Sequence, residues 1–211
     1  MTRIFLSILL MLVVTGCATT KVKDYEKFNA AKPRSILIVP VVNRSVEVTA
    51  PDYFLSTISV PLAERGYYVF PVNLVKRMLE DDGLSDSGLV HNASVEKLTN
   101  LFGADAVLYV TINQWDAQYL VFTTKVNVDL SYVIKDGKTG DTLWEHNQKM
   151  VYSPQQNSGG HPLAQLIVAV VNAAVAKAAP NYVPLAQQAN NQTFTYPGPG
   201  IPPGPYAQQQ E

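Results

Sequence analysis

The chain has 211 residues, 47% of them hydrophobic, and its 16 basic side chains nearly balance 17 acidic ones, for a net charge of −1 at pH 7. This length suits one folded domain with a sizeable core. The near-neutral balance argues against nucleic acid as a partner, because proteins that bind it carry a strongly basic face. The chain has a single cysteine, so it forms no internal disulfide and its stability must come from burial of the core.

Residues 1–16 have the pattern of a secretory signal peptide. Arg3 precedes an apolar run, Ile4–Val14, and the small residues Thr15 and Gly16 follow it. A positive charge, a short apolar run and small residues before a cleavage point are typical of such signals. The run is shorter than the ~20 apolar residues that a membrane-spanning helix needs. The sequence therefore predicts export.

The four residues Val14-Thr15-Gly16-Cys17 resemble the bacterial lipobox. The resemblance implies that Cys17 is the lipid attachment site, acylated with chains such as palmitate, and becomes the new amino terminus. Acylation would also remove an unpaired thiol from an oxidising compartment and would hold the mature chain on a membrane. Ala18 follows the cysteine, which by resemblance to enterobacterial sorting favours the outer membrane, with the domain facing the periplasm.

Residues 17–33 are polar and mixed in charge, and we expect them to form a tether between lipid and domain. Ser35–Val42 is an apolar, β-branched run, which predicts a strand buried on both faces, and Tyr67–Phe70 predicts a second strand. Between the two strands, the pattern predicts a helix that starts at a T-x-x-D capping box, kinks or breaks at Pro61 and ends at Gly66. The residues that carry this pattern are Thr49, Asp52, Phe54, Leu55, Ile58 and Leu62. This order predicts a βαβ unit with parallel strands.

Two further helices and a third buried strand are predicted next. Val72–Glu80 is the first helix, and the second begins near Asn92 or Ser94 and ends at Gly103. Ala104–Ile112 is again a continuous apolar run, typical of a buried strand.

From residue 120 onward the pattern changes. Residues 120–135 alternate apolar and polar, which predicts a long strand with one buried and one solvent-facing side. A turn at Asp136–Asp141 and an antiparallel strand over Thr142–Tyr152 follow. Leu163–Ala179 is apolar almost all round, which predicts a helix buried against the sheet or against another copy of the chain. Residues 187–211 are rich in Gln, Asn and Pro, and we expect a disordered tail.

Together these elements predict one α/β domain over residues 34–186. It is a single three-layer or two-layer domain with a mixed sheet, which has a parallel βαβ start and an antiparallel meander, and helices are packed on it.

No group of residues has the spacing of a catalytic, cofactor-binding or metal-binding site. Gly137-Lys138-Thr139 ends like a phosphate-binding loop, but it leads into a strand and fits a hairpin turn better. Ser85 and Ser87 lie between two glycines, but without the spacing or the preceding strand of a nucleophile elbow. The histidines lack metal-ligand spacing; they are His91, His146 and His161. We therefore expect no enzyme, no cofactor and no metal.

Three segments, in this order after the lipobox, resemble a family of predicted bacterial outer-membrane lipoproteins of unassigned activity, known as surface-antigen candidates. They are Ile36–Pro40, Leu62–Pro71 and Gly103–Leu108. More distantly, the order of elements is similar to periplasmic domains of the curli-secretion-channel lipoprotein, of the amino-terminal domain of the Tol translocation protein, and of lipoprotein activators of cell-wall synthases. Those domains bind proteins, so the resemblance implies a binding module, with Cys17 as the site residue it supplies.

The sequence thus favours a non-enzymatic envelope lipoprotein that docks other proteins in a cell-surface or secretion assembly. A homo-oligomer formed through the Leu163–Ala179 helix is one form that docking could take. Two alternatives stay open: a periplasmic activator of cell-wall synthesis, and a hydrolase that uses Ser85 or Ser87.

Overall fold

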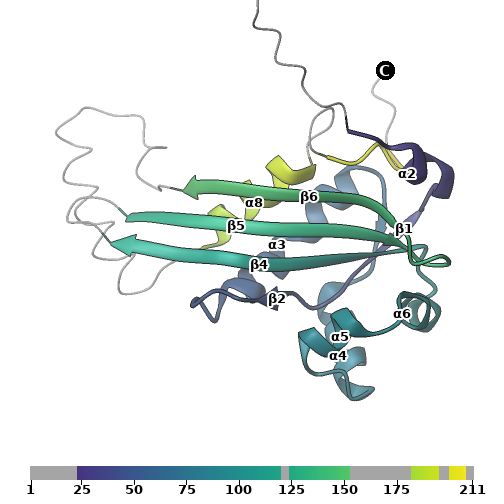
Figure 1. Cartoon of the computed structure of the whole chain (residues 1–211), viewed down its shortest axis with the longest axis horizontal. Helices are drawn as coiled ribbons and strands as arrows, with labels where there is room; N and C mark the ends of the chain where they lie inside the picture. The colour runs from purple at the N-terminus through teal and green to yellow at the C-terminus, as the bar shows by residue number, and fades with distance from the viewer. Residues whose placement is uncertain (1–22, 120–123, 153–181, 195–199, 208–211) are drawn as a thin grey trace, which may run out of the picture.

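The computed structural model describes residues 23–119, 124–152, 182–194 and 200–207 (Figure 1). Within these ranges a six-stranded mixed sheet has the strand order β3-β1-β4-β5-β6, and β2 pairs with β4. The strands are β1 (Ser35–Ile38), β2 (Val42–Asn43), β3 (Tyr68–Val69), β4 (Ala106–Tyr119), β5 (Thr124–Asp136) and β6 (Thr142–Tyr152). The α/β class with a mixed sheet is confirmed. The signal peptide, Cys17, His161 and the predicted helix Leu163–Ala179 lie outside the described residues.

The parallel half of the sheet follows the predicted strand–helix–strand order. β1 pairs in parallel with β3, through Ser35 opposite Tyr68, and with β4, through Leu37 opposite Val107. Because β1 lies between two parallel neighbours, its residues 36–38 are fully or almost fully buried. An apolar run without alternation is what such a central strand requires.

The antiparallel half is a meander of three long strands. β5 pairs with β4 on one side and β6 on the other, and the turn between β5 and β6 falls at the predicted place. β4 is longer than predicted: it continues past Ile112 to Tyr119, and residues 120–123, which the sequence placed within one strand, lie outside the described part. Pairing along the whole length of β5 holds the polar end of β4 in the sheet, and that support is not visible in the local sequence.

Six helices are seen in the described residues. They are α2 (Glu26–Ala31), α3 (Ala50–Glu64), α4 (Val72–Asp81), α5 (Ser87–Asn92), α6 (Val95–Phe102) and α8 (Val183–Phe194). α3, α4 and α6 match predicted helices, whereas α5 lies between the predicted helix Val72–Glu80 and the one expected to begin near Asn92 or Ser94, and was not predicted. At its start the Asp86 carboxylate accepts a hydrogen bond of 3.0 Å from the Leu89 amide, which satisfies one free N–H of the first turn.

Two details of α3 differ from the prediction. Thr49 makes no side-chain cap; its hydroxyl donates instead to the Glu47 carboxylate at 2.6 Å. The helix also does not break at Pro61 but continues to Glu64. Pro61 is buried, so packing of α3 on the sheet outweighs the backbone hydrogen bond that proline cannot make.

The helices form two hydrophobic cores on opposite faces of the sheet. One face of β1, β4, β5 and β6 packs on α3 and α8, with Phe54, Trp115 and Tyr132 at its centre. The other face carries α4, α5 and α6, whose apolar residues pack on Leu37, Val39, Val107 and Tyr109. Figure 1 shows α3 and α8 behind the long strands and α4, α5 and α6 grouped beneath β4. The parallel half therefore has three layers.

The structure corrects the expected disordered tail. α8 covers residues 187–194, and its buried positions recur at helical spacing; they are Leu185, Ala186, Ala189, Asn190, Thr193 and Phe194. Residues 200–207 pack beside the end of α3, with Ile201 fully buried. Apolar residues at helical spacing, Leu185, Ala186, Ala189 and Phe194, form most of this buried stripe although the segment is rich in Gln and Asn.

The predicted amino-terminal boundary of the domain, at residue 34, is also wrong. α2 lies within the expected tether, yet Phe28 is 3% exposed and packs edge-to-face on Tyr67 with ring centroids 6.2 Å apart. Lys23 lies over the Trp144 ring at 4.2 Å. The folded domain therefore begins by residue 23 and includes α2.

Candidate functional site

The antiparallel half of the sheet has one face that no described helix covers. On this side of the sheet, the helices extend as far as Tyr109. There the His91 ring of α5 packs edge-on against the Tyr109 ring, with ring centroids 5.1 Å apart. Beyond Tyr109, the side of the meander opposite the α3–α8 core is polar. We call this surface the open face; its residues are Thr111, Asn113, Gln114, Asp116, Asn127, Asp129, Ser131, Asn147, Lys149 and Val151.

A β-bulge in β4 concentrates amide groups on the open face. The register between β4 and β5 shifts between Ile112 and Gln114, so one extra residue stands in β4. Ile112 and Trp115 both point into the core, and the two residues between them, Asn113 and Gln114, both reach the open face. A bulge places two residues opposite one, and here it doubles the number of amide side chains presented.

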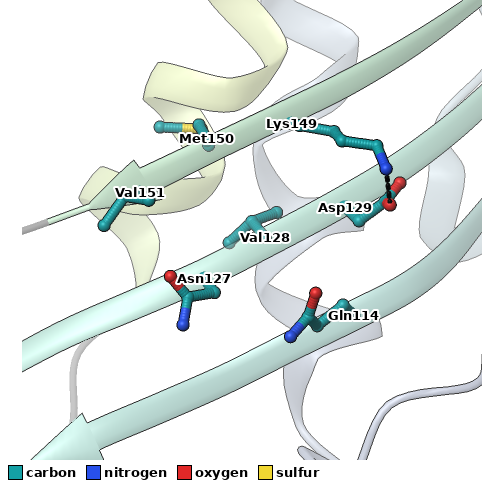
Figure 2. Close-up of a pocket in the computed structure, with 7 residues that line it drawn as sticks. All are labelled: Gln114, Asn127, Val128, Asp129, Lys149, Met150 and Val151. Atoms are coloured by element: carbon teal, nitrogen blue, oxygen red, sulfur yellow. Dashed lines mark ion pairs between the residues drawn. The ribbon is translucent and has the colours of Figure 1, made fainter.

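A hollow of about 430 Å³ lies on the open face. Figure 2 shows that its lining side chains come from three strands. Gln114 comes from β4, Asn127 and Asp129 from β5, and Lys149 and Val151 from β6. Strands with one face in the core leave alternate side chains for a partner, so the sheet itself fixes the spacing of these groups.

Hydrogen bonds and an ion pair fix the charged part of the hollow. Lys149 Nζ lies 2.9 Å from Asp129 Oδ2, and the Lys149 side chain is 76% exposed against 20% for Asp129. Asn113 Nδ2 donates to Asp129 Oδ1 at 3.3 Å and to Ser131 Oγ at 2.7 Å. Because Asp129 is held from both sides, it is a fixed acceptor beside an exposed cation.

Other groups of the hollow are available to a partner. In the part of the chain that is described, the Asn127 amide has no side-chain hydrogen bond, although it is half-buried. Val151 is 64% exposed. The Asn127 amide can both donate and accept hydrogen bonds, and the exposed Val151 lies beside it. Together they suit a partner surface that is mainly polar and makes one apolar contact.

The serines proposed for a hydrolase are not assembled into a catalytic set. Ser85 is exposed and Ser87 is the first residue of α5, and neither bonds a histidine in the described residues. His91 Nε2 instead lies 3.0 Å from the Pro40 carbonyl oxygen, and His146 Nε2 lies 3.1 Å from Gln148 Oε1. Burial lowers the pKa of both histidines.

The Gly137-Lys138-Thr139 segment forms the turn between β5 and β6. The Asp136 carboxylate accepts from the Lys138 and Thr139 amides at 2.9 and 2.8 Å, and Gly140 has a φ of +74°. These amides are used within the turn, so the hairpin prediction is confirmed.

The described ranges contain no cluster of three or more potential metal ligands. No helix in those ranges has both the length and the apolar character to cross a membrane.

Sequence reasoning predicted a strand with one solvent-facing side but did not identify the open face as a site. The signal was present in the run of polar residues at alternate positions from Lys125 to Ser131.

The fold and the open face define an α/β module with a solvent-facing sheet. The sequence profile of the GNA1162-like family of putative lipoproteins matches residues 23–206, and the chain belongs to that family. It is 33% identical over 174 residues to the putative lipoprotein NMB1124/NMB1162 of Neisseria meningitidis serogroup B, an alignment that covers 82% of this chain and 80% of the relative. The predicted family resemblance is thereby confirmed.

One solved structure agrees with this assignment. The crystal structure of lipoprotein GNA1162 from Neisseria meningitidis matches with a TM-score of 0.55 and 33% identity, covering 68% of this chain and 99% of that one. A PelC dodecamer from Paraburkholderia phytofirmans matches with a TM-score of 0.43 and 16% identity over 75% of this chain and 90% of that one. The carboxy-terminal domain of LpoB from Escherichia coli has a TM-score of 0.39 and 18% identity, over 56% of this chain and 84% of that one.

Proposed function

We propose that this chain is a non-enzymatic envelope lipoprotein, anchored through Cys17, that docks another envelope protein on its open face. Membership of a lipoprotein family supports the anchor, and the lipobox-like residues before Cys17 name the acylated position. Ala18 supports the outer membrane as its location, with the domain in the periplasm.

The observation that carries the docking proposal is the open face itself. Its polar groups are spread over three adjacent strands. Asn127 offers an amide that makes no side-chain hydrogen bond with any described residue, and Val151 offers an exposed apolar side chain. Pockets for small molecules are concave and mostly apolar, whereas this surface is broad and polar. It therefore fits a polar protein surface that complements the amides and the Asp129–Lys149 pair.

The test is photo-cross-linking in cells, with a photoreactive residue in place of Asn147 on the open face. We expect one discrete adduct with an envelope protein. The double variant Asn127→Arg/Val151→Arg should abolish the adduct, because two bulky cations would stand in the hollow.

The matched control is Asn100→Arg/Val60→Arg, which makes the same two changes at exposed positions of α6 and α3. It should leave the adduct unchanged. Equal loss in both double variants, or an adduct that survives the changes in the hollow, would overturn the docking proposal.

A further inference from the structure

A second hollow lies beside α2, away from the open face. It has a volume of about 580 Å³ and lies between the end of α2, the entry to β1 and residues 202–205. Phe28 and Tyr67 form its floor and are 3% and 4% exposed. Pro203 and Pro205 form part of its rim and are exposed. The floor and this part of the rim are thus aromatic or apolar.

The rest of the rim carries positive charge. Lys32 and Arg34 line the hollow with exposed side chains, and no carboxylate is among its lining residues. Neither side chain makes an ion pair with any residue that the structure describes. The Asp105 carboxylate, which lies against the backbone of Arg34, already accepts from the Arg34 amide, the Ser35 amide and the Ser35 hydroxyl at 2.9 to 3.1 Å.

The local backbone holds the two cations in place. Lys32 ends α2 in the left-handed conformation, with a φ of 47°, and its amide donates to the Phe28 carbonyl at 3.0 Å. The buried Pro33 follows, and proline fixes its own φ and restricts the residue before it. The two basic side chains therefore flank a rigid turn.

The length of the tether places this hollow relative to the membrane. Five residues lie between Cys17 and Lys23. Extended chain spans at most ~3.3–3.6 Å per residue, so an acyl anchor would lie within about 22 Å of Lys23. α2 begins three residues later. Figure 1 shows α2 on the opposite side of the long strands from α4 and α5. A lipid anchor on Cys17 therefore keeps the α2 side of the domain next to the leaflet.

We propose that this hollow binds the phosphate headgroup of an anionic phospholipid in the leaflet that holds the anchor. Arg34 offers a planar, bidentate donor to a phosphate and Lys32 a point charge. The aromatic floor and the exposed Tyr206, 60% exposed in the same segment, suit the boundary between headgroup and acyl chain, where Tyr is enriched. The proposal rests on the lipid anchor for its location, and its consequence is a fixed orientation of the domain on the membrane.

The test uses the mature chain with Cys17→Ser, so that acylation plays no part. We expect it to sediment with vesicles of phosphatidylethanolamine and phosphatidylglycerol and not with vesicles of phosphatidylcholine alone. Lys32→Gln/Arg34→Gln should weaken binding by about tenfold or more, because each basic residue at an anionic surface contributes several-fold in affinity.

The matched control is Lys76→Gln/Arg77→Gln on α4, which removes the same charge from the far side of the sheet and should change binding less than about twofold. Failure to bind anionic vesicles, or equal weakening in both double variants, would overturn the proposal. Since the protein in this assay has no acyl chain, that failure is distinct from any failure of Cys17 acylation in cells.

Discussion

The carbonyl oxygen of Gly66 accepts a hydrogen bond of 3.0 Å from the backbone amide of Tyr206, which fastens residues 200–207 to the end of α3. The Gly204 amide donates to the Arg65 carbonyl at 2.7 Å in the same place. The backbones approach so closely that a Cβ on Gly66 would overlap Ala207, and one on Gly204 would overlap Gly66. This carboxy-terminal segment is therefore part of the folded domain.

Gly66→Ala should destabilise the protein more than Gly83→Ala. Both glycines have a positive φ, +85° and +83°, and an alanine there costs about 1 kcal/mol or more in backbone strain. Only Gly66 also faces another backbone; a Cβ on Gly83 meets nothing within 4 Å. Urea unfolding should therefore show an additional loss of at least about 1 kcal/mol for Gly66→Ala. Equal losses would mean that residues 200–207 are not held against α3.

Tyr67→Phe should lower the free energy of unfolding by about 1 kcal/mol, the usual contribution of a hydrogen bond. The buried Tyr67 hydroxyl donates to the Pro202 carbonyl at 2.8 Å, and the variant leaves that carbonyl without this donor. Tyr68→Phe is the control, because its ring is 53% exposed, and it should change stability by less than about 0.5 kcal/mol. The two variants are compared by thermal and urea unfolding; a Tyr67 variant as stable as the control would contradict the contact.

Asn190→Ala should be among the costliest single changes in α8, at about 2–3 kcal/mol. Asn190 is fully buried; its amide donates to Thr57 Oγ1 at 2.9 Å, and its oxygen accepts from the Tyr132 hydroxyl at 3.4 Å. Removal would leave the buried Tyr132 hydroxyl without this acceptor. The exposed Gln187→Ala in the same helix serves as the control for helix propensity. Similar unfolding free energies for the two variants would show that Asn190 is not in the core.

Acidification should destabilise the protein through His91. Burial is the main cause that lowers the pKa of His91 below its usual 6.5, the charges of Arg44 and Lys135 lower it further, and the Pro40 carbonyl opposes them. Below pH 6.5 the unfolded chain then binds more protons than the folded one, so the free energy of unfolding falls as pH decreases.

His91→Gln should reduce the loss of stability between about pH 7.5 and pH 5.5, as measured by urea unfolding at each pH. His146, whose burial also lowers its pKa, leaves a residual slope in the variant. An unchanged slope would mean that His91 is as easily protonated in the folded state as in the unfolded state.

Strong local patterns predicted most of the sheet and the helices α3, α4 and α6. β6 has the predicted bounds, and α6 ends at Gly103, whose φ of +69° is the left-handed stop that glycine favours. In these segments periodicity and terminating residues agree, so local sequence alone is sufficient.

The missed elements depend on contacts between distant parts of the chain. α8 is polar in composition, and its stability comes from small residues packed on α3 and from the Asn190 hydrogen bonds. The end of β4 is held by β5, and residues 200–207 by the turn at Gly66. The alternation of polar and apolar residues in β5 indicated a solvent-facing side. The bulge that brings Asn113 and Gln114 to the same face cannot be recognised from the local sequence. Tertiary context decides such segments.

The central claim, that this family member is a lipid-anchored module, is tested most directly by mass spectrometry of the amino-terminal peptide of protein extracted from cell membranes. The proposal predicts a mature chain that begins at Cys17 and carries the mass of its attached acyl chains, and it predicts that Cys17→Ser abolishes both the modification and membrane retention. A mature chain that begins at another residue, or one that begins at an unmodified Cys17, would contradict it.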